Sequence, residues 1–150
     1  MKKFYLDKVK ILQKVVIANP EKKILALRRR LNDYNRSGAW DLAGGNIDEG
    51  DRNNFQEKTN LAVEAIKREA KEETGLGITN LKPIFIDSGV NKKGILVFLT
   101  AYQAKTNLSK VDLSDEHIEY RWVTKEEFGN LDVGEEGEFL KKIVRRVVVS

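Results

Sequence analysis

The first part of the chain contains two mostly apolar runs of the kind that form β-strands. Residues 11–18 and 24–27 are rich in β-branched and other apolar side chains, and the turn-forming segment 19–23 separates them. This pattern predicts a hairpin-like pair of strands.

A short strand that enters a pair of glycines is predicted next. Residues 31–38 are mostly turn formers and charged residues, which indicates a loop, whereas residues 40–43 predict a strand that runs into Gly44-Gly45. A second loop is expected over residues 46–58.

The rest of the chain mixes helical and extended patterns. The segment 60–74 has a helical pattern, with Thr59 or Asn60 as its N-cap and Gly75 as its end. The other predicted elements are strands at 81–86, 95–104 and 117–123, a helical turn opened by the capping-box pattern of 124–127, and an amphipathic helix at 135–147. Because helices and strands alternate irregularly, we expect the α/β (α+β) class, with a mixed sheet and helices packed on it.

Composition narrows the class of protein. The chain has 150 residues, of which 41% are hydrophobic, and a formal net charge of +4. This size suits one domain over residues 1–150. No apolar run is long enough to cross a bilayer and the N-terminus is charged, so we expect a cytoplasmic protein with no membrane partner. With no cysteine and one histidine, a metal would have to be held mainly by oxygen.

The segment 61–76 places carboxylates on the face of a helix that should be buried. At about 100° per residue, its apolar side chains fall within one arc of roughly 140°. These side chains are Ala62, Ala65, Ile66, Ala70 and Leu76. Glu69 and Glu73 lie near the centre of that arc, and Glu72 lies just past its edge. Burying such neighbours costs several kcal/mol, or forces protonation, unless a cation compensates them.

A divalent cation is the simplest compensation for these three glutamates. Oxygen ligands suit Mg²⁺, with Mn²⁺ as the alternative, and Mg²⁺ tends to bridge carboxylates and substrate phosphates. The cluster therefore indicates a phosphate-bearing substrate. The competing interpretation is a charged surface helix, in which Arg68 pairs with Glu72.

The sequence around this helix resembles the signature of the Nudix hydrolases. Residues 68–76, Arg-Glu-Ala-Lys-Glu-Glu-Thr-Gly-Leu, match every specified position in the second half of the Nudix box. Upstream, residues 40–45 look like the family's strand and double glycine, and residues 47–51 look like the loop that follows. The resemblance implies the family's α/β/α sandwich, in which a mixed sheet lies between helices.

Three departures from the family pattern lie in the first half of the box. Ala43 stands where the family usually has proline, and Asp51 stands where it has glutamate. Sixteen residues, 52–67, separate Asp51 from Arg68 where the family has seven, which is an insertion of nine. We interpret the polar segment 52–60 as an extended loop that borders the site and bears on the choice of substrate.

The resemblance also implies roles for individual residues. Glu69, Glu72 and Glu73 would bind the metal, with the backbone carbonyl of Gly44 as a further ligand. Arg68 would orient the glutamates by hydrogen bonds. Either Glu69 or Glu73 would help to deprotonate the attacking water.

Glu116 precedes a predicted strand, as an additional acidic ligand or base often does in this family. The alternative interpretation of Glu116 is a plain surface acid in a loop, and the sequence does not decide between them.

The implied activity is metal-dependent hydrolysis of the diphosphate linkage in a nucleoside diphosphate joined to another group. Nucleoside triphosphates, nucleotide sugars and dinucleoside polyphosphates all fit as nucleotide-type substrates. One alternative is a catalytically silent, nucleotide-binding regulatory module, although all three helix glutamates are present. The other is a basic nucleic-acid-binding domain, but the charge is mild and no aromatic and basic motif appears, so nucleic acid is not an expected partner. A homodimer is compatible with the resemblance.

Overall fold

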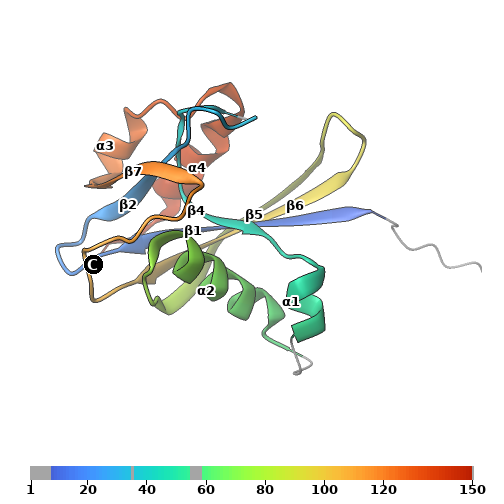
Figure 1. The fold of residues 1–150 in the computed structure, drawn as a ribbon, viewed down its shortest axis with the longest axis horizontal. Coiled ribbons are helices and arrows are strands. Elements are labelled where there is room, and N and C mark those ends of the chain that lie inside the picture. The colour runs from blue at the N-terminus through green and yellow to red at the C-terminus, as the bar shows by residue number, and fades with distance from the viewer. Residues whose placement is uncertain (1–7, 35, 55–58, 150) are drawn as a thin grey trace, which may run out of the picture.

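One mixed β-sheet with helices on both faces forms the body of the computed structural model, which describes residues 8–34, 36–54 and 59–149 (Figure 1). The strands are β1 (Val9–Ala18), β2 (Ile24–Arg29), β3 (Trp40–Asp41), β4 (Ala43–Asn46), β5 (Thr79–Val90), β6 (Leu96–Lys105) and β7 (His117–Val123). The helices are α1 (Glu49–Asn54), α2 (Leu61–Thr74), α3 (Lys125–Gly129), the 3-10 helix η1 (Glu135–Gly137) and α4 (Glu138–Arg146). This is the α/β/α sandwich that the sequence led us to expect.

Strand β1 occupies the middle of the sheet. The strand order is β3-β2-β1-β6-β5. In addition, β4 pairs with β1 and β7 pairs with β2. The β1–β6 pair is parallel, whereas the other strand pairs are antiparallel. Because β1 pairs with β4, Lys14 lies directly beside Gly44 and Gln13 lies beside Gly45. The central strand therefore supports the double glycine.

Two hydrophobic clusters fill the two faces of the sheet. On one face, Ile66 and Ala70 of α2 pack among apolar residues of β1 and β2. On the other face, Phe128 of α3 and Leu140 and Ile143 of α4 pack against the sheet. In Figure 1, α1 and α2 lie on one side of the sheet and α3 and α4 on the other. Helix α2 is thus anchored by its apolar residues, which fixes the direction of its polar ones.

Most predicted elements are present, with some differences at their ends. Strand β7 has the predicted bounds, and β5 is longer than the predicted 81–86 because its residues continue to pair with β6. Asn60 takes the N-cap position of α2 without a side-chain capping bond, and Gly75 ends this helix with φ 73°. The capping box that opens α3 is present, with Thr124 and Glu127 bonded reciprocally. The predicted C-terminal helix begins as η1 and continues as α4.

The predicted loop over residues 46–58 contains helix α1, so that prediction was wrong in part. The backbone N–H of Asp51 donates to Asp48 Oδ1, and the N–H of Asp48 donates to Asp51 Oδ2, both at 2.9 Å. Such reciprocal side-chain bonds begin a helix that polar composition alone does not reveal. The interpretation of 52–60 as extended loop fails for 52–54, which are helical, and residues 55–58 lie outside the described residues.

Candidate active site

The three glutamates of α2 differ in burial in the way that the helical arc predicted. Glu73 is 5% exposed, whereas the Glu69 and Glu72 side chains are 16% and 58% exposed. Burial follows from helix geometry, because the buried Ala70 and Ile66 fix the inward face and Glu73 falls on it. The acidic residues therefore run from the core to the surface along one side of α2.

The double glycine brings backbone against these carboxylates. The N–H of Gly44 donates to Glu73 Oε2 at 3.0 Å. Gly44 has φ 152°, and a Cβ at this position would lie 2.0 Å from the carbonyl oxygen of Gln13. A Cβ at Gly45 would lie 2.7 Å from Cδ of Glu69. Only glycine allows β4 to approach both β1 and α2 so closely.

Arg68 joins the loop half of the site to the helix half. Its Nε and Nη2 donate to the two carboxylate oxygens of Asp51, at 2.6 and 2.9 Å. Nη2 also donates to Glu69 at 3.1 Å, and Nη1 donates to Glu72 at 2.9 Å. Burial alone would raise the pKa of Asp51, but the Arg68 bonds bring it below its usual range, and the same bonds raise the pKa of Arg68. Asp51 has a shorter side chain than the glutamate expected at this position, and it reaches Arg68 from α1.

Glu116 comes close enough to α2 for its charge to matter. The segment before it packs on the end of this helix, because the N–H of Ser114 donates to the carbonyl of Glu73 at 3.2 Å. The Glu116 side chain is exposed, and its charge contributes to raising the pKa of both Glu69 and Glu73. The structure thus places the fourth acidic candidate near the inner two glutamates of α2.

Burial dominates the electrostatics of the inner glutamates. It raises the pKa of Glu73 to about 8, opposed in part by the charge of Lys14 and by the Gly44 N–H, and it raises the pKa of Glu69 as well. Ionising either group leaves negative charge in a place where water cannot solvate it fully. A cation would relieve that cost.

The donor set fits a hard divalent cation by its chemistry. It consists of carboxylates and a backbone carbonyl, which are the oxygen ligands that Mg²⁺ and Mn²⁺ take. Within the described residues, no three acidic or histidine side chains already converge as a metal-binding group. The reason is visible in their contacts: Glu69 and Glu72 bond to Arg68, and Glu73 bonds to Gly44. Each of these bonds uses one oxygen of its carboxylate, Oε1 of Glu69 and Oε2 of Glu72 and Glu73, so the second oxygen of each glutamate would be the one to meet a cation.

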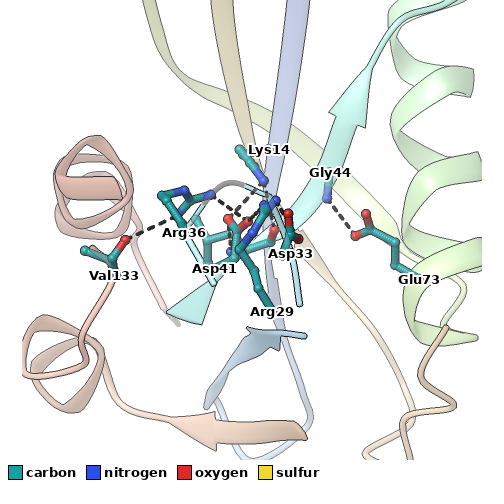
Figure 2. A network of polar contacts seen from close by, with 9 residues as sticks. Lys14, Arg29, Asp33, Arg36, Asp41, Gly44, Glu73 and Val133 are labelled. Atoms are coloured by element: carbon teal, nitrogen blue, oxygen red, sulfur yellow. Dashed lines mark hydrogen bonds and ion pairs between the residues drawn. The ribbon is translucent and has the colours of Figure 1, made fainter. Parts of the chain in front are cut away.

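A buried ionic cluster on the other side of β4 is a feature that sequence reasoning missed (Figure 2). Asp41 is 1% exposed, and its carboxylate accepts from Lys14 Nζ at 2.9 Å, Arg29 Nη1 at 3.0 Å and Arg36 Nη2 at 2.8 Å. Burial alone would raise the pKa of Asp41, but these cations hold it far below its usual range. The only local signals were single charged residues inside apolar strands, Lys14 in β1 and Asp41 between Trp40 and Leu42.

Comparisons with known proteins bear on the family and the fold. The NUDIX domain family model matches residues 13–147 of the chain. The MutT protein of Methanosarcina mazei Go1 is 26% identical with a TM-score of 0.66, and the match covers 94% of this chain and 97% of that one. The E. coli ORF135 protein is 18% identical with a TM-score of 0.67, covering 93% and 88%.

A third similar structure is the NUDIX domain of Shewanella oneidensis NrtR complexed with ADP ribose, which is 16% identical with a TM-score of 0.68 and covers 96% and 88%. The curated proteins give no match. Among the helices of the described residues, none is long and apolar enough to cross a membrane.

Proposed function

Because the chain belongs to the NUDIX domain family, we propose that it is a metal-dependent hydrolase acting on the diphosphate linkage of a nucleoside diphosphate joined to another group. A Nudix pyrophosphohydrolase is what the family and the similar MutT structures support. The nucleotide-type substrate, the metal and the role of each residue are the parts that we propose.

The buried carboxylate of Glu73 is the observation that carries this proposal. It lies 5% exposed beside Gly44, with Glu69 near it and the charge of Glu116 acting on both. Burying a carboxylate without a bound cation is costly, and a structural role would be served better by an apolar residue. A cation bound to Glu73 in the working enzyme would offset the energetic cost of burying this carboxylate. The need for such a ligand explains why a buried carboxylate is kept at this position.

We assign the residues as follows. Glu69, Glu72, Glu73, the Gly44 carbonyl and Glu116 would hold Mg²⁺, with Mn²⁺ as the alternative. When bound, such a cation neutralises the diphosphate and lowers the pKa of a coordinated water.

The chain's own groups then complete the chemistry. Glu69 or Glu73 takes a proton from the water that attacks phosphorus, and the leaving phosphate departs as an anion that needs little protonation. Arg68, held by both oxygens of Asp51, keeps Glu69 and Glu72 oriented toward the site.

A panel of diphosphate compounds tests the proposal directly. The full chain is incubated with a nucleoside triphosphate, a nucleotide sugar, ADP-ribose and a dinucleoside polyphosphate, each with Mg²⁺, with Mn²⁺ and with a chelator. We expect at least one compound to give two phosphate-bearing products, with turnover abolished by the chelator. Binding of a compound without turnover under any metal condition would instead identify a silent nucleotide-binding module.

A further inference from the structure

The Asp41 cluster, defined as Asp41, Lys14, Arg29 and Arg36, lies immediately before the double glycine. In addition to its bond to Asp41, Lys14 Nζ donates to the carbonyl of Leu42 at 3.3 Å. The N–H of Leu42 donates to Asp41 Oδ1 at 2.8 Å. The two residues that precede Ala43 are therefore held by charged contacts from the centre of the sheet.

The segment that follows has little rigidity of its own. Gly44 and Gly45 carry no side chain that could restrict the backbone, and glycine loses more conformational freedom on folding than any other residue. Yet Gly44 must keep φ 152° and its N–H must meet Glu73 at 3.0 Å. The restriction therefore comes from the pairing of β4 with β1 and from the contacts that hold Asp41 and Leu42, which precede β4.

Arg36 connects the Asp41 cluster to the part of the chain that precedes α4. Its guanidinium bonds Asp41 at 2.8 Å and also donates to the carbonyl of Val133 at 3.3 Å. It passes so close to Gly137 that a Cβ there would lie 2.8 Å from Nη1. The backbone of the same region is tied to β3, because the N–H of Trp40 donates to the carbonyl of Asp132 at 2.8 Å. The guanidinium of Arg36 is thus held by Asp41 through Nη2 and by Val133 through Nη1.

We propose that the Asp41 cluster is a positioning unit that holds the Gly44 backbone against Glu73, with Arg36 as the residue that braces it from the α4 side. Among the described residues, Asp41, Lys14 and Arg36 make no hydrogen bond to Glu69, Glu72 or Glu73. They act on these glutamates through β4 and through the charge of Lys14. This inference rests on the proposed function in one respect: the consequence for metal binding presupposes that Gly44 and Glu73 belong to a metal site.

Arg36→Met and Arg28→Met form a matched pair for testing this role. Both variants remove one positive charge, and both arginines bond a backbone carbonyl, since Arg28 Nε donates to Gly38 at 2.9 Å. Arg28 pairs with Glu119 at 3.5 Å, and in the described part of the chain its hydrogen bonds and ion pairs do not include Asp41. Arg36→Lys retains the charge but cannot bridge Asp41 and Val133 with a planar fork, so it should give an intermediate result.

The first measurement is amide hydrogen exchange of Gly44 in the folded, metal-free protein, followed by NMR. We expect exchange about tenfold faster in Arg36→Met than in the parent, a smaller increase in Arg36→Lys, and no change in Arg28→Met. Equal protection of Gly44 in Arg36→Met and Arg28→Met would overturn the proposal, because a purely local role in the 30–39 segment predicts that result.

The second measurement is Mn²⁺ affinity without substrate, by titration calorimetry. We expect several-fold weaker binding in Arg36→Met and parental affinity in Arg28→Met. Faster Gly44 exchange with unchanged Mn²⁺ affinity would overturn the positioning role in metal binding. Failure of the parent itself to bind Mn²⁺ would count against the proposed function, whereas the exchange measurement would still decide whether the Asp41 cluster holds Gly44.

Discussion

Asp41 and Glu73 are two buried carboxylates that flank the double glycine and have opposite electrostatic surroundings (Figure 2). Asp41 has three cations of the chain in direct contact, and its pKa is far below the usual range. Glu73 has one backbone N–H as its partner, and its pKa is raised to about 8. Lys14 acts on both, but it bonds Asp41 and reaches Glu73 only through its field.

This difference distinguishes a structural ion cluster at Asp41 from a candidate ligand-binding site at Glu73. The fold itself supplies the counter-charges of Asp41, so the group needs nothing from outside. Among the described residues, no cationic side chain bonds to Glu73, although it is almost as deeply buried. A carboxylate in that condition is a candidate for function, because its environment becomes favourable only when something else binds.

Glu73→Gln should produce the largest effect in this comparison. The amide keeps the size of the side chain but cannot serve as an anionic ligand or base, so we expect hydrolysis of the best panel substrate to fall by about 10²- to 10⁴-fold. Steady-state kinetics at saturating Mg²⁺ measures this. Glu64→Gln on the exposed face of the same helix is the control, and equal activity of the two variants would remove Glu73 from the site.

Asp41→Asn should reduce the stability of the fold, whereas Glu73→Gln should reduce activity. It leaves Lys14, Arg29 and Arg36 with an uncharged partner, so we expect the free energy of unfolding to fall by about 3–5 kcal/mol. Urea denaturation at neutral pH gives this number, and Asp115→Asn, which changes an exposed acid, should stay within about 0.5 kcal/mol of the parent. A tolerated Asp41→Asn would mean that the cluster is not needed for stability.

The pH dependence of stability should distinguish the two carboxylates without any mutation. The folded pKa of Glu73 is raised from 4.5 to about 8, so its protonated form stabilises the fold. That contribution is fully present below pH 4.5 and is lost as the pH rises through about 8. We expect metal-free stability to fall by a few kcal/mol across this window. Thermal unfolding of the parent and Glu73→Gln should show the slope only in the parent.

Asp41 should give a slope of the other sign at lower pH. Its folded pKa is depressed, so its contribution is present above the unfolded value of 3.8 and is lost as the pH falls below it. Adding Mg²⁺ or Mn²⁺ at pH 8 should restore the stability lost through ionisation of Glu73 and leave the loss of stability at low pH unchanged. A metal effect seen only at low pH would contradict the assignment of Glu73 as a metal ligand.

Gly45→Ala should have the smallest of these effects. The added Cβ would meet the Glu69 carboxylate at 2.7 Å, and the side chain must shift to relieve this contact. We expect Mn²⁺ affinity to fall about tenfold, equivalent to about 1.4 kcal/mol. Gly77→Ala is the matched control, because a Cβ there meets nothing within 4 Å. Unchanged affinity in Gly45→Ala would show that Glu69 can move freely.

The parts of the site that sequence reasoning found are those that depend on local geometry. The positions of Glu69, Glu72 and Glu73 relative to the buried face follow from the period of one helix, and their exposures of 16%, 58% and 5% keep that order. The end of α2 at Gly75 and the capping box at Thr124 are local for the same reason. Helix α1 was missed because its start depends on side chains bonding backbone, in a segment of helix-neutral polar residues.

The sequence by itself predicted most of the strand and helix pattern and the acidic face of α2, and it led to the expectation of a hard cation with a phosphate-bearing substrate. Only the tertiary structure decided which charges meet across the fold. Asp41 and Lys14 are 27 residues apart, and Asp51 and Arg68 are 17 apart, so each pair forms only after strands and helices have packed. Within the residues that the structure describes, tertiary packing thus gave Asp41 three bonded cations and gave Glu73 a backbone N–H instead. Which side chains are buried and which charged groups bond to one another depend on how the elements pack. The periodicity of a single helix or strand does not encode this.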